Sequence, residues 1–219
     1  MQDLKYIEIE TNPNPTASVI WLHGLGASGH DFEPVVPELG LPSDAAVRFI
    51  FPHAPNLPVT INGGMRMPAW YDIKAMDIDR VVDTEQLMAS SDAVAKLVDQ
   101  EIERGVKSEH IVIAGFSQGG AVAFELGMSY PKRLAGILAL STYFATADSV
   151  AVSDANRGLP ISIFHGNRDP MVPESLGRQS VEKLKGLGFE PSYKTFSMEH
   201  SVCMEEVVEI GEFLKRYLL

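Results

Sequence analysis

The chain has little cysteine and a shortage of positive charge. Cys203 is its one cysteine, so an internal disulfide and a multi-cysteine metal site are both excluded. The 18 lysines and arginines are outnumbered by 29 aspartates and glutamates, which gives a formal net charge of -11. No basic cluster could neutralise a row of phosphates, so nucleic acid is not expected as a partner.

The sequence also lacks long hydrophobic runs. A helix that crosses a membrane needs about 20 apolar residues, whereas the apolar runs here are short and bounded by glycine or proline. The N-terminus shows neither the basic start nor the apolar stretch of a secretory signal. We therefore expect a cytoplasmic protein without a transmembrane segment.

What is present is the composition of a folded globular protein. Of the 219 residues, 45% are hydrophobic and 21% are charged, which leaves enough apolar side chains for a continuous core. No repeat, charge block or low-complexity linker divides the chain. This favours one domain over residues 1–219.

Short apolar runs rich in β-branched residues alternate with helical patterns. Such runs are typical of strands covered on both faces. They occupy residues 18–22, 47–51, 111–114, 137–140, 161–164 and, less apolar, 193–196. Helical periodicity and end signals occur at residues 84–104, 120–130, 173–187 and 203–217. The alternation predicts an α/β fold, a mostly parallel central sheet with helices on both faces.

Two segments depart from this alternation. Residues 6–10 alternate apolar and polar side chains, which predicts an edge strand with one solvated face. Residues 52–83 are rich in proline and glycine and are expected to be irregular. A segment of this length on an α/β domain is often a cover over a functional site.

The most informative motif is GFSQG at residues 115–119, which has the form G-x-S-x-G. It lies directly after the predicted strand 111–114 and directly before a predicted helix. A nucleophile elbow requires this setting, because its serine stands on a tight turn between small neighbours. Ser117 is therefore the candidate nucleophile. The alternative is an ordinary glycine-rich turn.

A serine hydroxyl needs a base and a group that orients the base, in the chain order serine, acid, histidine. Asp169 lies in a turn after the predicted strand 161–164, and His200 lies in a loop after residues 193–196. Both positions follow the carboxyl end of a strand, in the required order. We predict Asp169 as the acid and His200 as the base.

Other residues compete for these roles. His23 and His165 each precede a glycine at a strand end, and His165 is close to Asp169 in the sequence. Both are ranked below His200 because the base is expected after the acid. Asp154 is the weaker acid candidate, since no strand leads into it.

The oxyanion of acyl transfer needs two aimed backbone N–H groups. One is expected from Gln118, the residue after the nucleophile, and the other from Leu25 in the HGLG loop at residues 23–26. Residues 24–29 also match the dinucleotide fingerprint G-x-G-x-x-G. Two prolines follow it, however, and no acidic residue ends the next strand, so nucleotide binding is disfavoured.

No cofactor or metal ion is expected. The sequence has no H-E-x-x-H motif and no cysteine pair. Cys203 lies at the start of an apolar helical stripe and is expected to be a small buried residue rather than a nucleophile.

Taken together, these residues resemble the phospholipase/carboxylesterase family of α/β-hydrolases, which includes bacterial carboxylesterases and acyl-protein thioesterases. The resemblance covers nearly the whole chain and runs through residues 22–26, 70–72, 115–120, 165–173 and 200–203. It implies the α/β-hydrolase fold, with Ser117, Asp169 and His200 as a catalytic triad. It also implies an oxyanion hole formed by the N–H groups of Leu25 and Gln118.

Apolar residues of the cover segment and of the loop after Asp169 are predicted to contact the acyl group. They are Leu57, Ile61, Met65, Trp70, Met171 and Val172. The negative charge does not favour docking on anionic lipid. We therefore expect a small soluble ester or an acylated thiol as substrate, in preference to bulk phospholipid.

The function predicted from the sequence is a carboxylesterase that cleaves short- to medium-chain esters through an acyl-enzyme. Acyl-protein thioesterase and lysophospholipase are alternatives on the same site, and the triad alone does not exclude a peptidase or acyltransferase. An inactive hydrolase fold used to bind a ligand or partner is the non-enzymatic alternative. Exposed apolar residues on the cover would permit a homodimer.

Overall fold

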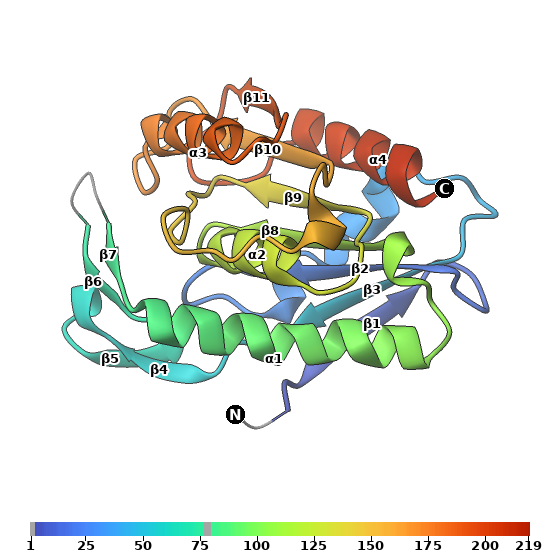
Figure 1. The fold of residues 1–219 in the computed structure, drawn as a ribbon, viewed down its shortest axis with the longest axis horizontal. Coiled ribbons are helices and arrows are strands. Elements are labelled where there is room, and N and C mark those ends of the chain that lie inside the picture. The colour runs from blue at the N-terminus through green and yellow to red at the C-terminus, as the bar shows by residue number, and fades with distance from the viewer. Residues whose placement is uncertain (1–2, 77–79) are drawn as a thin grey trace.

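A seven-stranded sheet forms the centre of the computed structural model, which describes residues 3–76 and 80–219 (Figure 1). Its strands in chain order are β1 (Tyr6–Glu10), β2 (Ala17–Leu22), β3 (Val47–Pro52), β8 (Ile111–Phe116), β9 (Gly136–Leu140), β10 (Ile161–Gly166) and β11 (Ser192–Phe196). Side by side they lie in the order β1-β3-β2-β8-β9-β10-β11. The edge strand β1 is antiparallel to β3, and every other neighbouring pair is parallel. The predicted α/β fold is confirmed.

Helices cover both faces of this sheet (Figure 1). One face carries α1 (Thr84–Glu103), α2 (Gln118–Ser129) and α3 (Glu174–Gly186), and the other carries α4 (Met204–Leu218) and the 3-10 helix η2 (Glu33–Leu39). Shorter 3-10 turns are η1 (Gly29–Asp31), η3 (Thr60–Asn62), η4 (Ser108–His110) and η5 (Asp154–Asn156). Within the described ranges, no helix is both long and apolar enough to cross a membrane.

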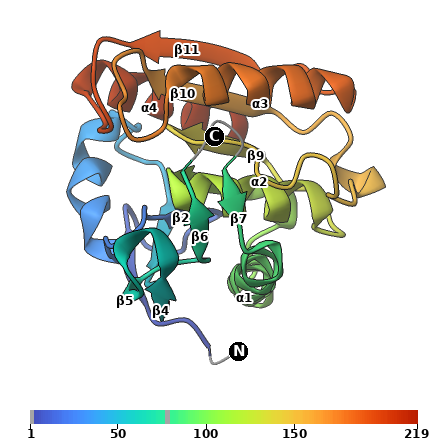
Figure 2. The same cartoon turned by 90° about the vertical axis from the view of Figure 1, so that its left-hand side faces the viewer.

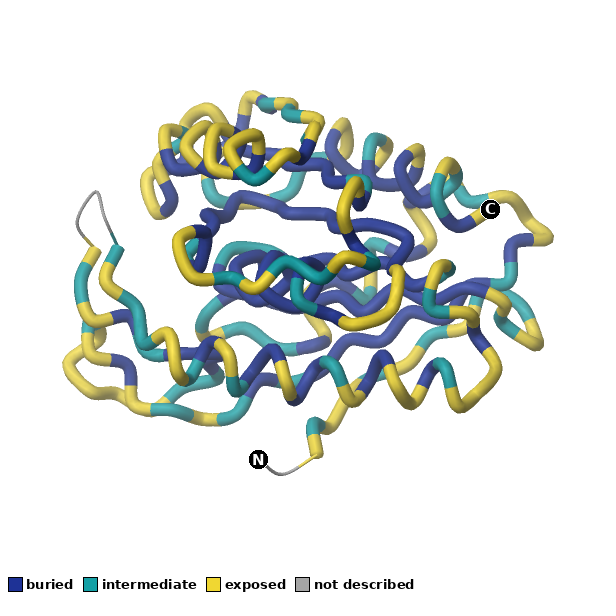
Figure 3. Tube along the Cα trace, in the orientation of Figure 1, coloured by how far each residue is buried: buried dark blue, intermediate teal, exposed yellow. Residues whose placement is uncertain are grey.

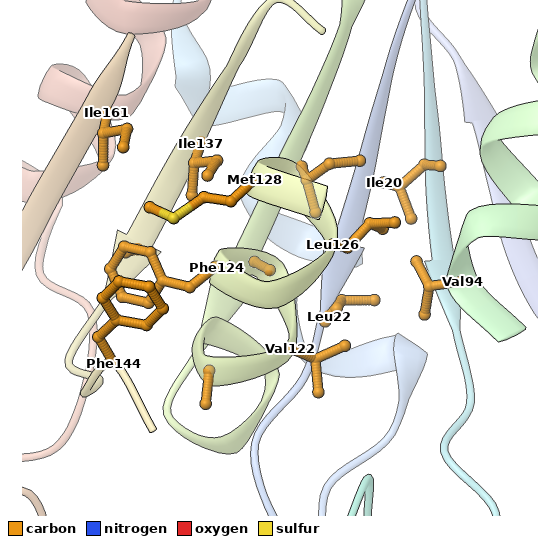
Figure 4. Close-up of a cluster of buried hydrophobic side chains, with 14 of the residues drawn as sticks. Ile20, Leu22, Val94, Val122, Phe124, Leu126, Met128, Ile137, Phe144 and Ile161 are labelled. Carbon is orange, nitrogen blue, oxygen red and sulfur yellow. The ribbon is translucent and has the colours of Figure 1, made fainter. Parts of the chain in front are cut away.

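The alternation of side chains along each strand divides the core into two layers. In β2, Ile20 and Leu22 face the layer under α1 and α2, whereas Val19 and Trp21 face the layer under α4. All of these side chains are fully buried, and in Figure 3 the central strands are dark blue while yellow marks the outer faces of the helices. Figure 4 shows the first layer, where Leu22, Phe124 and Ile137 lie between α2 and the sheet.

The cover segment is more ordered than its proline and glycine content predicts. It contains two antiparallel pairs, β4 (Asn56–Val59) with β5 (Met65–Pro68), and β6 (Ile73–Ala75) with β7 (Val81–Val82). These pairs stand apart from the main sheet at one end of it (Figure 2). The expectation of an irregular segment was therefore wrong. Very short strands tolerate Pro58 and Pro68, since little of their hydrogen-bonding capacity is used.

The cover is tied to the carboxyl ends of β2 and β8. The Gly26 N–H, just beyond β2, donates to the Pro68 carbonyl at 2.8 Å. The side chain of Gln118, just beyond β8, accepts from the Trp70 N–H at 2.7 Å and donates to the Tyr71 carbonyl at 2.6 Å. Asp83 caps α1 by accepting the Gln86 N–H at 3.0 Å. The cover thus lies where βα loops of a parallel sheet gather.

Candidate active site

Ser117 occupies a strained turn between β8 and α2. Its φ and ψ angles are 53° and -119°, a region that non-glycine residues rarely adopt. The turn is held from both sides, because the Ser117 N–H donates to the Leu140 carbonyl at 2.8 Å and the Ser117 carbonyl accepts from Thr142 Oγ1 at 2.6 Å. The strain is the backbone signature of a serine presented on an elbow.

The glycines of GFSQG are required by close packing. A Cβ on Gly115 would stand 2.3 Å from the Gly119 carbonyl oxygen. A Cβ on Gly119 would stand 2.6 Å from the carbonyl oxygen of Leu22 and 2.7 Å from that of His23. Backbone atoms cannot move aside as a flexible side chain can, so these positions exclude any side chain.

Asp169 and His200 form a close pair beyond the ends of neighbouring strands. Nδ1 of His200 lies 2.6 Å from Oδ2 of Asp169, although 31 positions separate the two residues in the chain. His200 is half-buried and lines the same cavity as Ser117, and its ring centroid lies 4.7 Å from that of Phe116. The structure therefore brings the predicted nucleophile, acid and base to one edge of the sheet.

The second oxygen of Asp169 is held by the backbone of its own loop. Oδ1 accepts the N–H groups of Met171 and Val172, both at 2.8 Å. Burial by itself would raise the pKa of Asp169. The bond from His200 and the bonds from Val172 and Met171 outweigh that effect and hold the pKa below its ordinary value. Asp169 is thus an ionised, fixed acceptor for the imidazole.

The two rival histidines serve the scaffold. His23 is buried, accepts the Ala54 N–H at Nε2 (3.1 Å) and donates from Nδ1 to the Gly24 carbonyl (2.7 Å). His165 is fully buried and donates from Nε2 to the Val172 carbonyl at 2.8 Å. Burial lowers the pKa of both rings, so both are neutral.

The rival acid, Asp154, is almost fully exposed and pairs with Arg157 on the surface at 2.7 Å. It makes no contribution to the site edge where Asp169 and His200 meet.

A cavity of about 260 Å³ opens beside Ser117. Its described lining combines the site residues with apolar side chains: Gly24, Leu25, Ala27, Asp31, Ile61, Ile73, Met76, Arg80, Phe116, Ser117, Gln118, Tyr143, Met171, Val172 and His200. Leu25 and Gln118, the expected oxyanion residues, both lie there. Gln118 is the first residue of α2, so its N–H has no acceptor within the helix.

The acyl contacts predicted from sequence divide into two groups. Ile61, Met171 and Val172 line the cavity, whereas the described lining does not include Leu57, Met65 or Trp70. The expectation for those three is corrected.

Each of the three has a different reason to lie outside the cavity. Leu57 is half-buried within β4, and Met65 points outward with 64% of its surface exposed. Trp70 is fully buried, and its indole N–H donates to the His23 carbonyl at 2.8 Å. Trp70 therefore braces the loop that carries Leu25.

Six lining residues outside the two motifs were not predicted: Ala27, Asp31, Ile73, Met76, Arg80 and Tyr143. Tyr143 carried a usable signal, because it follows the carboxyl end of β9 at the edge where the other site residues gather. Arg80 carried none, since nothing in its sequence neighbourhood indicates which element it meets. In the part of the chain that the structure describes, no group of three His, Cys, Asp or Glu side chains could hold a metal ion.

Comparison with known proteins agrees with this geometry. The model of a family described as phospholipase/carboxylesterase matches residues 4–218. The chain belongs to this family. It is accordingly a hydrolase of carboxylic esters or thioesters.

Family relatives resemble the chain over most of its length. An acyl-protein thioesterase 1 of Gibberella zeae is 42% identical over 214 residues, which cover 93% of this chain and 91% of the relative. A protein of the same name in Neurospora crassa is 39% identical over 93% of this chain and 87% of its own.

Solved structures of the family superpose closely as well. Arabidopsis thaliana SOBER1 superposes with a TM-score of 0.86 at 30% identity, covering 93% of this chain and 99% of its own. Zea mays acyl-protein thioesterase 2 gives 0.87 at 28% identity, covering 98% of this chain and 99% of its own. The recognised family resemblance is confirmed.

Proposed function

We propose that this hydrolase is a serine carboxylesterase that cleaves short- to medium-chain esters through an acyl-enzyme. The observation that carries the proposal is the Asp169–His200 pair at 2.6 Å, whose His200 lines the same cavity as Ser117 on its strained turn. A nucleophile, a base and an oriented acid on one cavity are the groups that acyl transfer needs.

In the proposed mechanism, His200 Nε2 takes the proton of the Ser117 hydroxyl while Oγ attacks the carbonyl carbon. The carbonyl π electrons move to the oxygen, and the backbone N–H groups of Leu25 and Gln118 receive the resulting oxyanion. Collapse expels the alcohol or thiol, which takes the proton from His200. Water then repeats the two steps on the acyl-enzyme and releases the acid, restoring Ser117. Asp169 keeps the Nδ1 proton in place throughout.

The cavity supports an acyl group of limited size. Ile61, Met171 and Val172 offer apolar contacts, and a volume of about 260 Å³ is small beside a long fatty chain. A cavity of about 150 Å³ holds a benzene molecule, so this one holds on the order of ten carbon atoms. This is the observation behind the preference for short and medium chains.

Acyl-protein thioesterase is the second candidate, favoured by the names of the Gibberella and Neurospora relatives. Lysophospholipase activity stays an alternative, because the description of the matching family includes phospholipases. We propose further that residues 1–219 form one domain, which acts in the cytoplasm on small molecules and does not bind nucleic acid. We also expect a homodimer, which sedimentation velocity would test.

The deciding experiment measures hydrolysis of p-nitrophenyl esters of increasing acyl length by the wild type, with Ser117→Ala purified identically as the blank. Activity that disappears in the variant supports the nucleophile, and the peak of the length series sizes the cavity. A butyryl thioester of a cysteine peptide, followed by thiol release, separates the thioesterase candidate from the carboxylesterase. A folded wild type that cleaves none of these would overturn the proposal and favour an inactive fold that binds a ligand.

A further inference from the structure

A second cavity adjoins the one beside Ser117. It has about 250 Å³ and lies between the segment that follows β9 and the helix α3. Its described lining is more polar: Arg80, Tyr143, Phe144, Ala145, Asp148, Leu176, Gln179, Ser180 and Lys183. Arg80 and Tyr143 line both cavities. These two side chains therefore stand at the boundary between a cavity fit for an acyl group and a second, unassigned space.

Contacts from three separate parts of the chain hold this boundary. The Arg80 guanidinium donates from Nη2 to the Met171 carbonyl, in the loop that also carries Asp169. Its central carbon lies 5.0 Å from the centre of the Tyr143 ring, within the range of a cation–π contact. The Tyr143 hydroxyl in turn lies 2.8 Å from that of the fully buried Tyr71. Arg80 is thus bound on two sides, and its aromatic support is anchored in the core.

Arg80 is also placed where it would block an acyl chain that extends from Ser117 through the first cavity toward the second. Arg80 directly precedes β7, and Figure 2 shows β6 and β7 across the end of the sheet, below α3 in that view. Ile73, Met76 and Met171 are apolar neighbours on the active-site side. An alkyl tail that follows them meets a guanidinium, which it cannot solvate, at the point where the second cavity begins.

We infer that Arg80 determines the acyl-length specificity of this enzyme by closing the far end of the acyl cavity, and that its removal joins the two cavities into one longer channel. The inference rests on the proposed function. In the variant, the distal carbons of a longer straight acyl chain would occupy the space lined by Gln179 and Ser180. The wild type excludes them from that space.

The test compares acyl-length profiles of Arg80→Ala and the wild type on p-nitrophenyl esters from butyrate to palmitate. Each buried methylene raises kcat/KM by about fourfold until the cavity is full. We expect the wild-type rise to stop at medium length. In Arg80→Ala it continues for several more carbons, so the ratio of laurate to butyrate hydrolysis increases by at least tenfold. Arg80→Met keeps most of the bulk and is expected to give a smaller increase.

A blocking substitution makes the test specific for the second cavity. Gln179 is exposed on α3 and lines only that cavity among the two, so Gln179→Phe can fill it from the rim. The gain of Arg80→Ala should disappear in the double variant Arg80→Ala/Gln179→Phe, a coupling that a double-mutant cycle measures. Lys185→Ala, on the same helix but outside both linings, is the matched control and should leave every ratio unchanged.

The results decide between two readings. An unchanged length profile in folded Arg80→Ala and Arg80→Met, or a gain that Gln179→Phe does not reverse, would overturn the inference. Failure of the proposed function looks different, because it appears as absent Ser117-dependent hydrolysis of butyrate in the wild type itself. Thermal melting of each variant distinguishes a changed cavity from a misfolded protein.

Discussion

Replacing Asp169 by asparagine changes one atom and should disable the base. The geometry decides how the amide sits, because Oδ1 accepts two backbone N–H groups at 2.8 Å, whereas the one hydrogen bond to Oδ2 comes from His200 Nδ1 at 2.6 Å and His165 Nε2 stays 3.8 Å away. The amide oxygen must stay toward Met171 and Val172, since the opposite orientation would set an NH₂ group against two donors. The NH₂ group then faces His200 and forces Nδ1 to become an acceptor.

The tautomer that results carries its proton on Nε2 and cannot accept one from Ser117. In a serine protease triad the equivalent asparagine lowers kcat by about 10⁴ with the geometry intact, or about 5 kcal/mol of transition-state stabilisation. We expect a loss of the same order for Asp169→Asn. Stability should change little, because both backbone bonds to the loop survive. Asp169→Ala, by contrast, leaves those N–H groups without their acceptor, at a cost of about 1–3 kcal/mol for each one that stays buried.

The assay is kcat on p-nitrophenyl butyrate for wild type and Asp169→Asn, with Ser117→Ala subtracted as background and thermal melting run in parallel. A folded Asp169→Asn variant that retains more than a tenth of the wild-type kcat would refute the assigned role of the carboxylate. Equal loss of stability in the asparagine and alanine variants would refute the argument from the two backbone donors.

Two further predictions concern buried groups near the site. His165→Leu leaves the Val172 carbonyl without its donor and should lower kcat/KM by on the order of 10²-fold, because the loop that carries Asp169 is displaced. His165→Gln keeps a donor and should restore most of the lost kcat/KM. Equal rates in the two variants would contradict this role of His165. Glu206 is fully buried in α4, and this burial raises the pKa of its carboxyl from 4.5 to about 8. Because the folded state holds this proton more tightly, stability declines as the pH rises from 4.5 through 8. Urea unfolding should therefore show Glu206→Gln gaining on the order of 3 kcal/mol over the wild type between about pH 5 and pH 9, and a gain independent of pH would count against it.

Local patterns were sufficient where the physics is local. The GFSQG motif specified small residues around Ser117, and the structure explains them by backbone oxygens within 3 Å of any added Cβ. Strand runs and helix ends gave the α/β fold because side-chain period and capping are properties of neighbouring residues.

Local patterns failed where contacts join distant segments. Trp70 is a large aromatic residue of the kind that often lines a pocket. In the fold, however, its indole N–H donates to the carbonyl of His23, 47 positions away, and its side chain is not part of the cavity lining. His165 and His200 both follow strands, and only the fold shows which ring meets Asp169 at 2.6 Å and which is fixed to the Val172 carbonyl. The four short strands of the cover segment were not predicted, because its prolines hide any alternating pattern and the strands are defined by pairing with each other.

The sequence by itself determined the class of fold, because strand and helix periodicity is local. Its short motifs supplied candidates for nucleophile, acid and base in chain order, and the resemblance that these motifs carry pointed to the family. Only the tertiary structure decided which apolar side chains enclose the cavity and that Arg80 lines it, in contact with Tyr143 and the Met171 carbonyl. The shape of a cavity depends on how three or more segments meet. That depends on packing between residues far apart in the chain, which no local pattern encodes.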